Sequence, residues 1–149
     1  NDDLVLNGVN IQNEITVPEI SGIVSDYASV PEVRVKLVEL QREMSKRFNV
    51  IMDGRDIGTV VLKDAPFKFF LTATPEERAN RRFKELKERN IECEYEVILK
   101  DIIERDYKDS HREVDPLRKA DDAIEVDTTG LNIKEVTEKI NSVISNNIK

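Results

Sequence analysis

The sequence predicts an α/β fold with a parallel sheet flanked by helices, because short runs of strand-forming residues alternate with segments of helical periodicity. The predicted strands are short and rich in β-branched or aromatic residues, and they cover residues 50–52, 67–71 and 123–126. Helices between and around them are predicted at residues 30–47, 74–89 and 95–109, with a final helix from about residue 132. A chain of 149 residues of this kind fits one domain with a modest core.

Three of these helices carry a capping-box pattern, in which a polar N-cap residue stands three positions before a glutamate. The pairs are Ser29 with Glu32, Thr74 with Glu77, and Asn132 with Glu135. The final helix also shows an apolar stripe at helical spacing, formed by Ile133, Val136, Ile140, Val143 and Ile144. Both signals are local, so they predict where these helices begin.

The first 20 residues predict a small antiparallel unit. Its two strand-like pieces are Leu4–Leu6 and Glu14–Val17, and turn signals stand at Asn7-Gly8 and at Pro18. We found no internal repeat, low-complexity segment or linker long enough to divide the chain.

Composition excludes several classes of function. The net charge of −7 and the isoelectric point near 4.9 argue against general binding of nucleic acid or acidic membranes. No apolar run has the length of a signal peptide or membrane span, and Cys93 has no cysteine to pair with, so we expect a cytoplasmic protein. Cys93 lies between two glutamates and His111 lacks partners at ligand spacing, so we expect no nucleophile and no metal site.

The most informative segment is Val50–Val61, where a predicted strand ends in two acids, an arginine and two glycines. Ligands bind at the carboxyl ends of strands in open parallel sheets, so this pattern indicates a binding site. Turn formation around a local ion pair of Asp53, Arg55 and Asp56 is the alternative. The segment is not a phosphate loop, because the pattern G-x-x-x-x-G-K-[ST] does not occur in the 149 residues.

Two groups of arginines share helical faces. Arg105, Asp109 and Arg112 stand at i, i+4 and i+7, which suits a phosphorylated sugar but also a solvated salt-bridge ladder. The other group comprises Arg78, Arg81 and Arg82, for which a solvated face paired with nearby glutamates is the alternative.

The segment Val50–Val61, taken with Glu104–Arg112, resembles the bacterial cytidylate kinases, and the resemblance covers essentially the whole chain. It implies a three-layer nucleoside monophosphate kinase-like parallel sheet, incomplete at the N-terminus, because those kinases carry a phosphate loop on their first strand. Residues 1–29 would then be a remnant of the acceptor subdomain. Residues 30–149 would form the core domain, with a short lid around residues 78–95.

The resemblance also implies roles for single residues. Contacts with cytosine are implied for Arg34, Asp56 and Arg112, contacts with the sugar for Ser25, Arg105 and Asp109, and a phosphate contact for Arg55. Contacts with the transferring phosphoryl group are expected from the lid arginines Arg78 and Arg82. Without the resemblance, Arg34 would be taken for a surface residue, although a cation near a helix N-terminus is unfavourable. The loop Asp127–Gly130 resembles the one that packs near adenine, although a plain strand-to-helix turn explains it nearly as well.

The implied reaction is transfer of the γ-phosphoryl group from ATP, as its Mg²⁺ complex, to CMP or dCMP. We expect a monomer that prefers CMP over UMP, because Asp56 can accept a hydrogen bond from the cytosine amino group. We also expect the 149 residues alone to be inactive without a phosphate loop. The alternative is a non-catalytic nucleotide-binding or interaction module that naturally lacks this loop, and the coding sequence upstream of Asn1 would discriminate the two.

Overall fold

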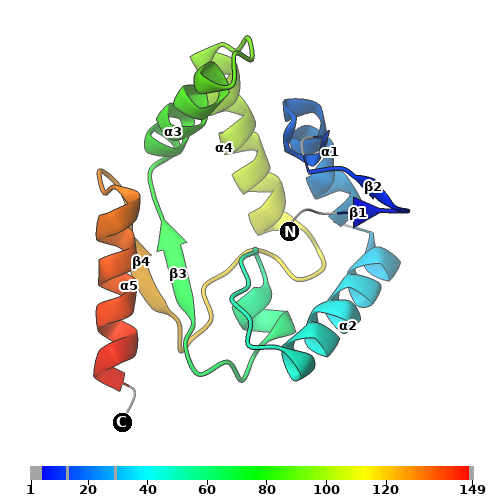
Figure 1. The fold of residues 1–149 in the computed structure, drawn as a ribbon, viewed down its shortest axis with the longest axis vertical. Coiled ribbons are helices and arrows are strands. Elements are labelled where there is room, and N and C mark those ends of the chain that lie inside the picture. Colours follow the sequence, from blue (N-terminus) through cyan, green and yellow to red (C-terminus); the bar gives the residue numbers. More distant parts are fainter. Residues whose placement is uncertain (1–4, 13, 29, 148–149) are drawn as a thin grey trace.

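The computed structural model describes residues 5–12, 14–28 and 30–147. Figure 1 shows a helical hairpin, a small parallel sheet with the C-terminal helix beside it on one side, and the N-terminal β-hairpin and helices on the other side. In chain order the elements are β1 (Val5–Leu6), β2 (Val9–Asn10), the 3-10 helix η1 (Glu14–Thr16), α1 (Pro18–Ala28), α2 (Pro31–Arg47), the π-helix η2 (Ile57–Val61), β3 (Phe69–Thr72), α3 (Pro75–Glu88), α4 (Tyr95–His111), β4 (Ile124–Asp127) and α5 (Ile133–Asn147). None of the described helices is both long and apolar enough to span a bilayer.

The predicted parallel sheet is present in reduced form. β3 and β4 pair in parallel from Phe69 opposite Ile124 to Thr72 opposite Asp127, and α3 and α4 form the connection between them. Both strands begin one or two residues later than predicted. The predicted strand at residues 50–52 is wrong, because this segment joins no ladder among the described residues and Ile51 is 103% exposed. A strand needs a hydrogen-bonded neighbour, and the structure pairs β3 with β4 alone within the described part of the chain.

Of the three predicted capping boxes, the one at Asn132 is confirmed in full, and the one at Thr74 only in its N-cap bond, because the Thr74 N–H donates to the Thr129 hydroxyl at 3.2 Å. The hydroxyl of Thr74 accepts a hydrogen bond from the backbone N–H of Glu77 at 3.2 Å. The Asn132 side chain accepts from the N–H of Glu135 at 3.0 Å, and the Glu135 carboxylate accepts from the N–H of Asn132 at 2.7 Å. Helix α2 differs, because its N-cap residue is Val30, which provides no side-chain cap, and Ser29 lies outside the described residues.

The N-terminal unit is partly as predicted. β1 and β2 form an antiparallel hairpin whose two turn residues, Asn7 and Gly8, have φ angles of 51° and 81°. This is the geometry that favours Asn-Gly in two-residue hairpins. The predicted strand Glu14–Val17 is wrong, because η1 occupies Glu14–Thr16 and α1 follows from Pro18. Proline suits the first turn of a helix, so Pro18 begins a helix instead of marking a turn.

The buried core lies between α3 and α4. Ala79 and Leu86 of α3 and Ile98 of α4 are at most 8% exposed, and half-buried apolar side chains surround them. Phe83 and Tyr95 add an edge-to-face ring contact with centroids 6.3 Å apart. Cys93, for which we expected no chemical role, packs against this cluster. The hairpin is therefore held by apolar packing that the exposed charges on both helices do not disturb.

A second feature fixes the hairpin where α3 ends. Asn90 has a φ of 55°, and its N–H donates to the Lys87 carbonyl at 3.0 Å. The N–H of Ile91 donates to the Leu86 carbonyl at 2.9 Å, which completes a Schellman motif. Ile91 then packs against the core cluster. The subdomain boundary predicted near residue 29 and the lid predicted around residues 78–95 stay predictions.

The segment after Asp56 is anchored to α2. In η2 the N–H of Leu62 donates to the Ile57 carbonyl at 2.7 Å, the five-residue spacing of a π-helix. Arg42 of α2 donates to the carbonyls of Val60 at 2.6 Å and Val61 at 3.0 Å. These bonds satisfy carbonyls at the end of η2 and hold the preceding acidic loop close to α2.

Candidate functional site

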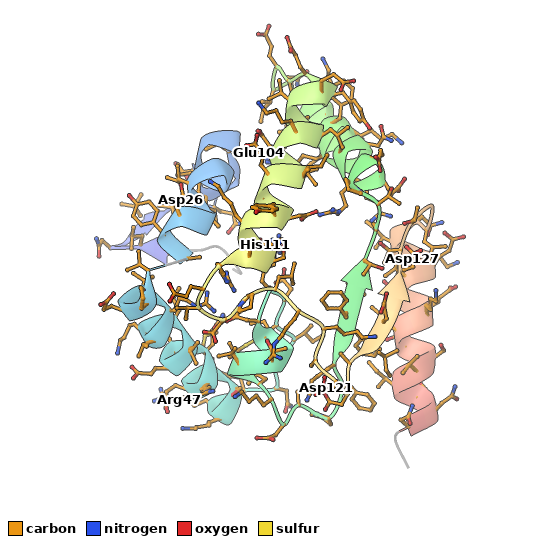
Figure 2. All side chains as sticks on the ribbon, turned by 180° about the vertical axis from the view of Figure 1, so that it is seen from behind. Asp26, Arg47, Glu104, His111, Asp121 and Asp127 are labelled. Carbon is orange, nitrogen blue, oxygen red and sulfur yellow. The ribbon has the colours of Figure 1, made fainter. Side chains whose placement is uncertain are left out.

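The predicted site residues gather where three segments meet: the start of α2, the loop at residues 53–56, and the end of α4 with the loop that follows it. Figure 2 marks this end of α4 by His111. We call the group the arginine–carboxylate cluster, and it consists of Arg34, Arg55, Asp56, Arg105, Asp109, Arg112 and Asp115. Its members come from positions up to 81 residues apart in the sequence.

Arg34 is the most enclosed arginine of the cluster, with 7% of its surface exposed. Its guanidinium donates to the carboxylate of Asp56, to the carboxylate of Asp115 at 3.2 Å, and to the Ala28 carbonyl at 3.0 Å. The two carboxylates compensate for a cation that is buried near a helix N-terminus, where the helix dipole opposes it. The surface alternative for Arg34 is therefore wrong, and its contact with cytosine stays a prediction.

Asp109 is a buried carboxylate held between two arginines. It is 5% exposed, accepts from Nε of Arg55 at 3.1 Å, and lies 3.8 Å from Nε of Arg105. The solvated-ladder alternative is thus wrong for Asp109. The Arg105 Nε is buried and has no hydrogen-bond partner among the described residues, and 3.8 Å is too long for one. Burial lowers the pKa of Arg105, and the neighbouring Arg55 lowers it further.

Arg112 is tied to the loop that follows α4. Its Nε and Nη2 donate to the backbone carbonyl of Asp115 at 2.7 and 2.5 Å. The Leu117 N–H donates to the Asp109 carbonyl at 2.7 Å, so this loop folds back on the end of α4. Burial lowers the pKa of Arg112, and the nearby Arg34 has the next largest effect.

Sequence reasoning missed Asp115. It is one acid in a polar loop, and nothing in its neighbours distinguishes it from Glu113. Its importance follows from a contact with Arg34, 81 positions away, which no local pattern encodes. The cluster therefore holds four arginines against three carboxylates, and this balance favours an anionic ligand.

The lid arginines lie elsewhere, on α3. Arg78 donates through Nη1 and Nη2 to Asp106 of α4 at 2.9 and 2.5 Å, and through Nε to the Ala73 carbonyl at 3.2 Å. The hydrogen bonds with Asp106 raise the pKa of Arg78. Arg82 pairs with Glu85 at 2.7 Å on the same helix, as its alternative interpretation predicts. The structure therefore brings neither residue into the arginine–carboxylate cluster.

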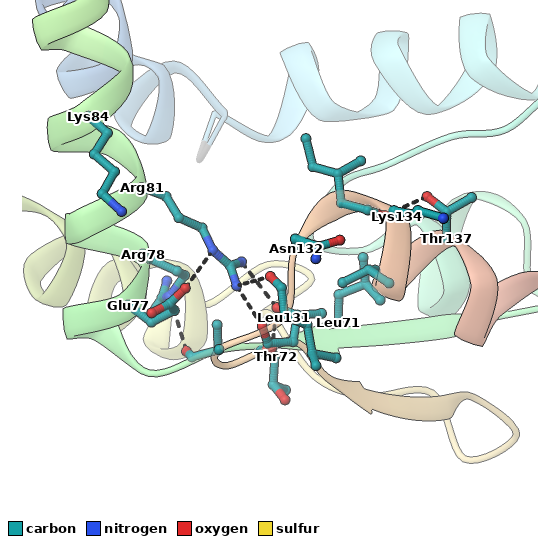
Figure 3. Close-up of a pocket in the computed structure, with 15 residues that line it drawn as sticks. Leu71, Thr72, Glu77, Arg78, Arg81, Lys84, Leu131, Asn132, Lys134 and Thr137 are labelled. Atoms are coloured by element: carbon teal, nitrogen blue, oxygen red, sulfur yellow. Dashed lines mark hydrogen bonds and ion pairs between the residues drawn. The ribbon is translucent and has the colours of Figure 1, made fainter.

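A separate cavity of about 960 Å³ opens where β3 and β4 end. Figure 3 shows it between α3 and the start of α5, with Arg78, Arg81, Lys84 and Lys134 contributing cationic groups to its lining. Arg81 donates to the carbonyl of Thr128 at 2.5 Å and thereby joins α3 to the loop after β4. The carboxyl ends of parallel strands are the usual ligand position in open sheets.

The loop after β4 is shaped by its own hydrogen bonds. The Thr128 N–H and hydroxyl both donate to the Thr72 carbonyl, at 2.8 and 2.9 Å. Asp127 accepts from the Thr129 N–H at 2.9 Å, and this bond lowers the pKa of Asp127. The loop thus keeps the ends of β3 and β4 together at the cavity, which is consistent with both a turn and a ligand contact.

Ser25 and His111 are the remaining positions singled out in the sequence. Ser25 lies in α1, but its side chain is outside the part of the structure that is described. His111 stacks on Tyr107 with ring centroids 4.1 Å apart and forms hydrogen bonds on α4, as expected for a hydrogen-bonding residue. Within the described residues, no three His, Cys, Asp or Glu side chains are grouped as a metal site.

Comparison of the sequence with known proteins identifies a family. A family model described as "Cytidylate kinase" matches residues 1–146. A cytidylate kinase from Clostridium perfringens strain SM101 is 68% identical over 142 residues, which cover 95% of this chain and 65% of the relative. Cytidylate kinases from Clostridium acetobutylicum and Clostridium tetani are 60% and 56% identical, and the chain covers 68% and 65% of their lengths. The chain belongs to the cytidylate kinase family.

Proposed function

We propose that the protein containing these 149 residues transfers the γ-phosphoryl group of ATP to CMP or dCMP, giving ADP and CDP or dCDP. Family membership supports the reaction, and one observation carries the acceptor specificity. Asp56 is held by the buried Arg34 while Arg55 and Arg105 surround Asp109 beside it. An orienting carboxylate and a cationic surface for phosphate therefore occur in one cluster.

In this proposal, different residues of the cluster contact the base, the phosphate and the sugar of the acceptor nucleotide. Asp56 accepts the exocyclic N4–H of cytosine, and Arg34 and Arg112 supply donors for its acceptor atoms. Arg55 uses only Nε toward Asp109, and the structure describes no hydrogen bond from its terminal NH₂ groups, which suit phosphate oxygens. Arg105 and Asp109 contact the pentose in this proposal, and the family resemblance adds Ser25 to them. This division explains why the cluster mixes carboxylates with arginines.

The cavity at the ends of β3 and β4 suits the ATP side of the reaction. Its four cationic side chains outnumber its one carboxylate, Glu77, which favours the phosphates of ATP, and the Mg²⁺ arrives bound to ATP as part of the substrate. Phosphoryl transfer depends on positioning and charge stabilisation and needs no protein nucleophile. Arg78 and Arg82 provide that charge in our proposal. Arg78 then exchanges Asp106 for a phosphate oxygen when nucleotides are bound.

A phosphate loop completes the site. The 149 residues contain no G-x-x-x-x-G-K-[ST] pattern, and the relatives extend beyond the matched part. We assign this loop to the remainder of the protein, where it lies on a further strand of a three-layer, nucleoside monophosphate kinase-like sheet. The complete enzyme in this proposal is a cytoplasmic monomer.

The test is acceptor selectivity of the complete protein. With CMP and UMP as acceptors, kcat/KM should favour CMP by on the order of 10³-fold, because uracil leaves the Asp56 carboxylate facing another acceptor. Asp56→Asn should remove most of this preference, because its amide donates as well as accepts. Asp64→Asn, which removes an exposed carboxylate nearby, is the matched control and should keep it. Equal kcat/KM for CMP and UMP in the wild type would defeat the proposal, and CMP binding without transfer would favour a non-catalytic module.

A further inference from the structure

Asp115 contacts both arginines that the proposed function places on cytosine. Its carboxylate accepts from Nε of Arg34 at 3.2 Å, and its backbone carbonyl accepts from Nε and Nη2 of Arg112 at 2.7 and 2.5 Å. One loop residue therefore joins a side chain from α2 to a side chain from the end of α4. No other described residue forms hydrogen bonds with both of these arginines.

The backbone at Asp115 has an unusual conformation. Its φ is 48°, in the left-handed region that non-glycine residues seldom adopt, although aspartate tolerates it better than most. Two bonds fix the loop in this form: the one from Arg112 to the Asp115 carbonyl and the one from Leu117 to Asp109. An outlier that the surrounding structure maintains is typical of a functional site.

The carboxylate also completes the balance of charge around Arg34. This arginine is buried, and Asp56 alone would have to serve both as its counter-ion and as the acceptor for cytosine. The Asp115 carboxylate shares the first task. Its side chain is 32% exposed and that of Asp56 is 14% exposed, so Asp115 is the more solvent-accessible of the two counter-ions of Arg34. Asp56 can then turn an oxygen toward a ligand without leaving Arg34 uncompensated.

We propose that Asp115 is a positioning residue for acceptor recognition, which orients Arg34 through its carboxylate and Arg112 through its carbonyl. This inference rests on the proposed function. Asp115 does not contact the substrate in this proposal and acts through the two arginines. Its loss therefore weakens binding of CMP and recognition of cytosine, while use of ATP at the separate cavity is unchanged.

Two substitutions in the complete protein separate the carboxylate from the backbone. Asp115→Asn keeps the shape and removes the charge, whereas Asp115→Gly removes the side chain and adopts a φ of 48° without strain. Both keep the carbonyl that holds Arg112. We expect each to raise KM for CMP by about tenfold and to reduce the CMP-to-UMP preference, with KM for ATP unchanged. Glu113→Gln removes the same charge from an exposed side chain of the same loop and should change none of these values.

The outcomes are distinguishable. Unchanged KM for CMP in both variants would overturn the positioning role. A loss of activity in which kcat, both KM values and the melting temperature all change together would also overturn it, because a merely structural residue gives that result. A wild-type protein that fails to phosphorylate CMP would overturn the proposed function and this inference with it. If the wild-type protein prefers CMP over UMP and the Asp115→Gly variant behaves like it, the inference is overturned but the proposed function is not.

Discussion

Asp109 illustrates, at the scale of one residue, how burial changes the meaning of a charge pattern. In the sequence it stands between Arg105 and Arg112, on the same predicted helical face, and could belong to a solvated ladder. In the structure it is 5% exposed and accepts from Arg55, a residue 54 positions away. A carboxylate in this position holds two arginines together, so its removal affects the fold as well as the ligand site.

Replacing Asp109 should therefore destabilise the protein. Asp109→Asn retains the shape but leaves the guanidinium groups of Arg55 and Arg105 without their counter-charge, at a cost of about 1–3 kcal/mol in the free energy of unfolding. Arg105→Ala should cost less, roughly 1 kcal/mol, because that side chain is 36% exposed. Urea unfolding measures both. Lys100→Gln on the same helix, in an exposed pair, is the control, and an Asp109→Asn variant as stable as this control would contradict the prediction.

A second residue-scale prediction concerns pH. Lys68 donates to Asp122 at 2.5 Å, and this hydrogen bond lowers the pKa of Asp122. A carboxyl whose pKa is lower in the folded state adds stability above its unfolded pKa of about 3.9. That contribution is lost as the pH falls through the folded pKa.

The contribution of the Lys68–Asp122 pair should therefore appear as a difference in the pH dependence of stability between the wild type and a variant. Between about pH 5 and pH 3, wild-type stability should fall more steeply than that of Asp122→Asn, which cannot titrate at this position. Asp121→Asn, an equal charge change at the neighbouring exposed acid, should follow the wild type. Denaturant unfolding at pH 5, 4 and 3 gives the slopes. Parallel slopes for wild type and Asp122→Asn would show that solvent screens the pair completely.

At the scale of elements, the α3–α4 hairpin shows what local sequence can specify. Thr74 caps α3 at one end, and Asn90 ends it in a Schellman motif at the other. The apolar residues between them recur at helical spacing and pack against α4. These signals act over a few residues, so they are present in the sequence before any tertiary contact forms.

Asn90 provides the test of this element. Asn90→Gly should leave the free energy of unfolding unchanged or raise it slightly, because glycine adopts a φ of 55° freely. Asn90→Ala should lower it by about 1 kcal/mol, because a β-carbon disfavours the left-handed region. Chemical unfolding of the two variants measures the difference, and equal stabilities would mean that the hairpin relaxes into another turn.

Elements that depend on distant partners were predicted less well. The capped helices α3 and α5 begin where predicted, whereas the strand at residues 50–52 does not form because no described segment pairs with it. Helix α1 was missed because Pro18 suits a turn and a helix start equally. The π-helix at residues 57–61 is held by Arg42 from α2, a tertiary contact without a local signal.

The site residues also differ in whether a local sequence pattern could reveal them. Arg105 and Asp109 share a visible helical spacing, and the loop with Arg55 and Asp56 stands out as a strand end rich in charge. The resemblance to a family supplied Arg34, whose burial between two carboxylates only the structure reveals. Asp115 had neither kind of signal. The roles of these residues toward CMP remain predictions, because contacts within the cluster do not identify its ligand.

At the scale of the whole molecule, two cationic regions are arranged around α4. The arginine–carboxylate cluster lies at the end of α4. The cavity is lined by residues of α3 and of the ends of β3 and β4. The Arg78–Asp106 bond joins α3 to α4 between them. Our proposed function expects domain closure of the complete enzyme to bring acceptor and donor nucleotides together from these two sides, with Arg78 contacting the transferring phosphoryl group.

The chain of 149 residues should nevertheless form no measurable CDP by itself. A phosphate loop binds the triphosphate through backbone amides and a lysine, and no such pattern occurs in this sequence. At the sheet, residues 50–52 join no ladder and β3 is paired only with β4 among the described residues. The unpaired edge should also make the isolated chain prone to association.

The assay combines the purified chain with ATP, Mg²⁺ and CMP, and the complete protein is the positive control. Circular dichroism should first show that the chain keeps its helices, so that inactivity is not mistaken for unfolding. Adding the remainder of the protein as a separate polypeptide should restore CDP formation if it supplies the phosphate loop and a strand beside β3. CDP formation by the chain alone would contradict the prediction, because the donor phosphates would then be bound without a phosphate loop.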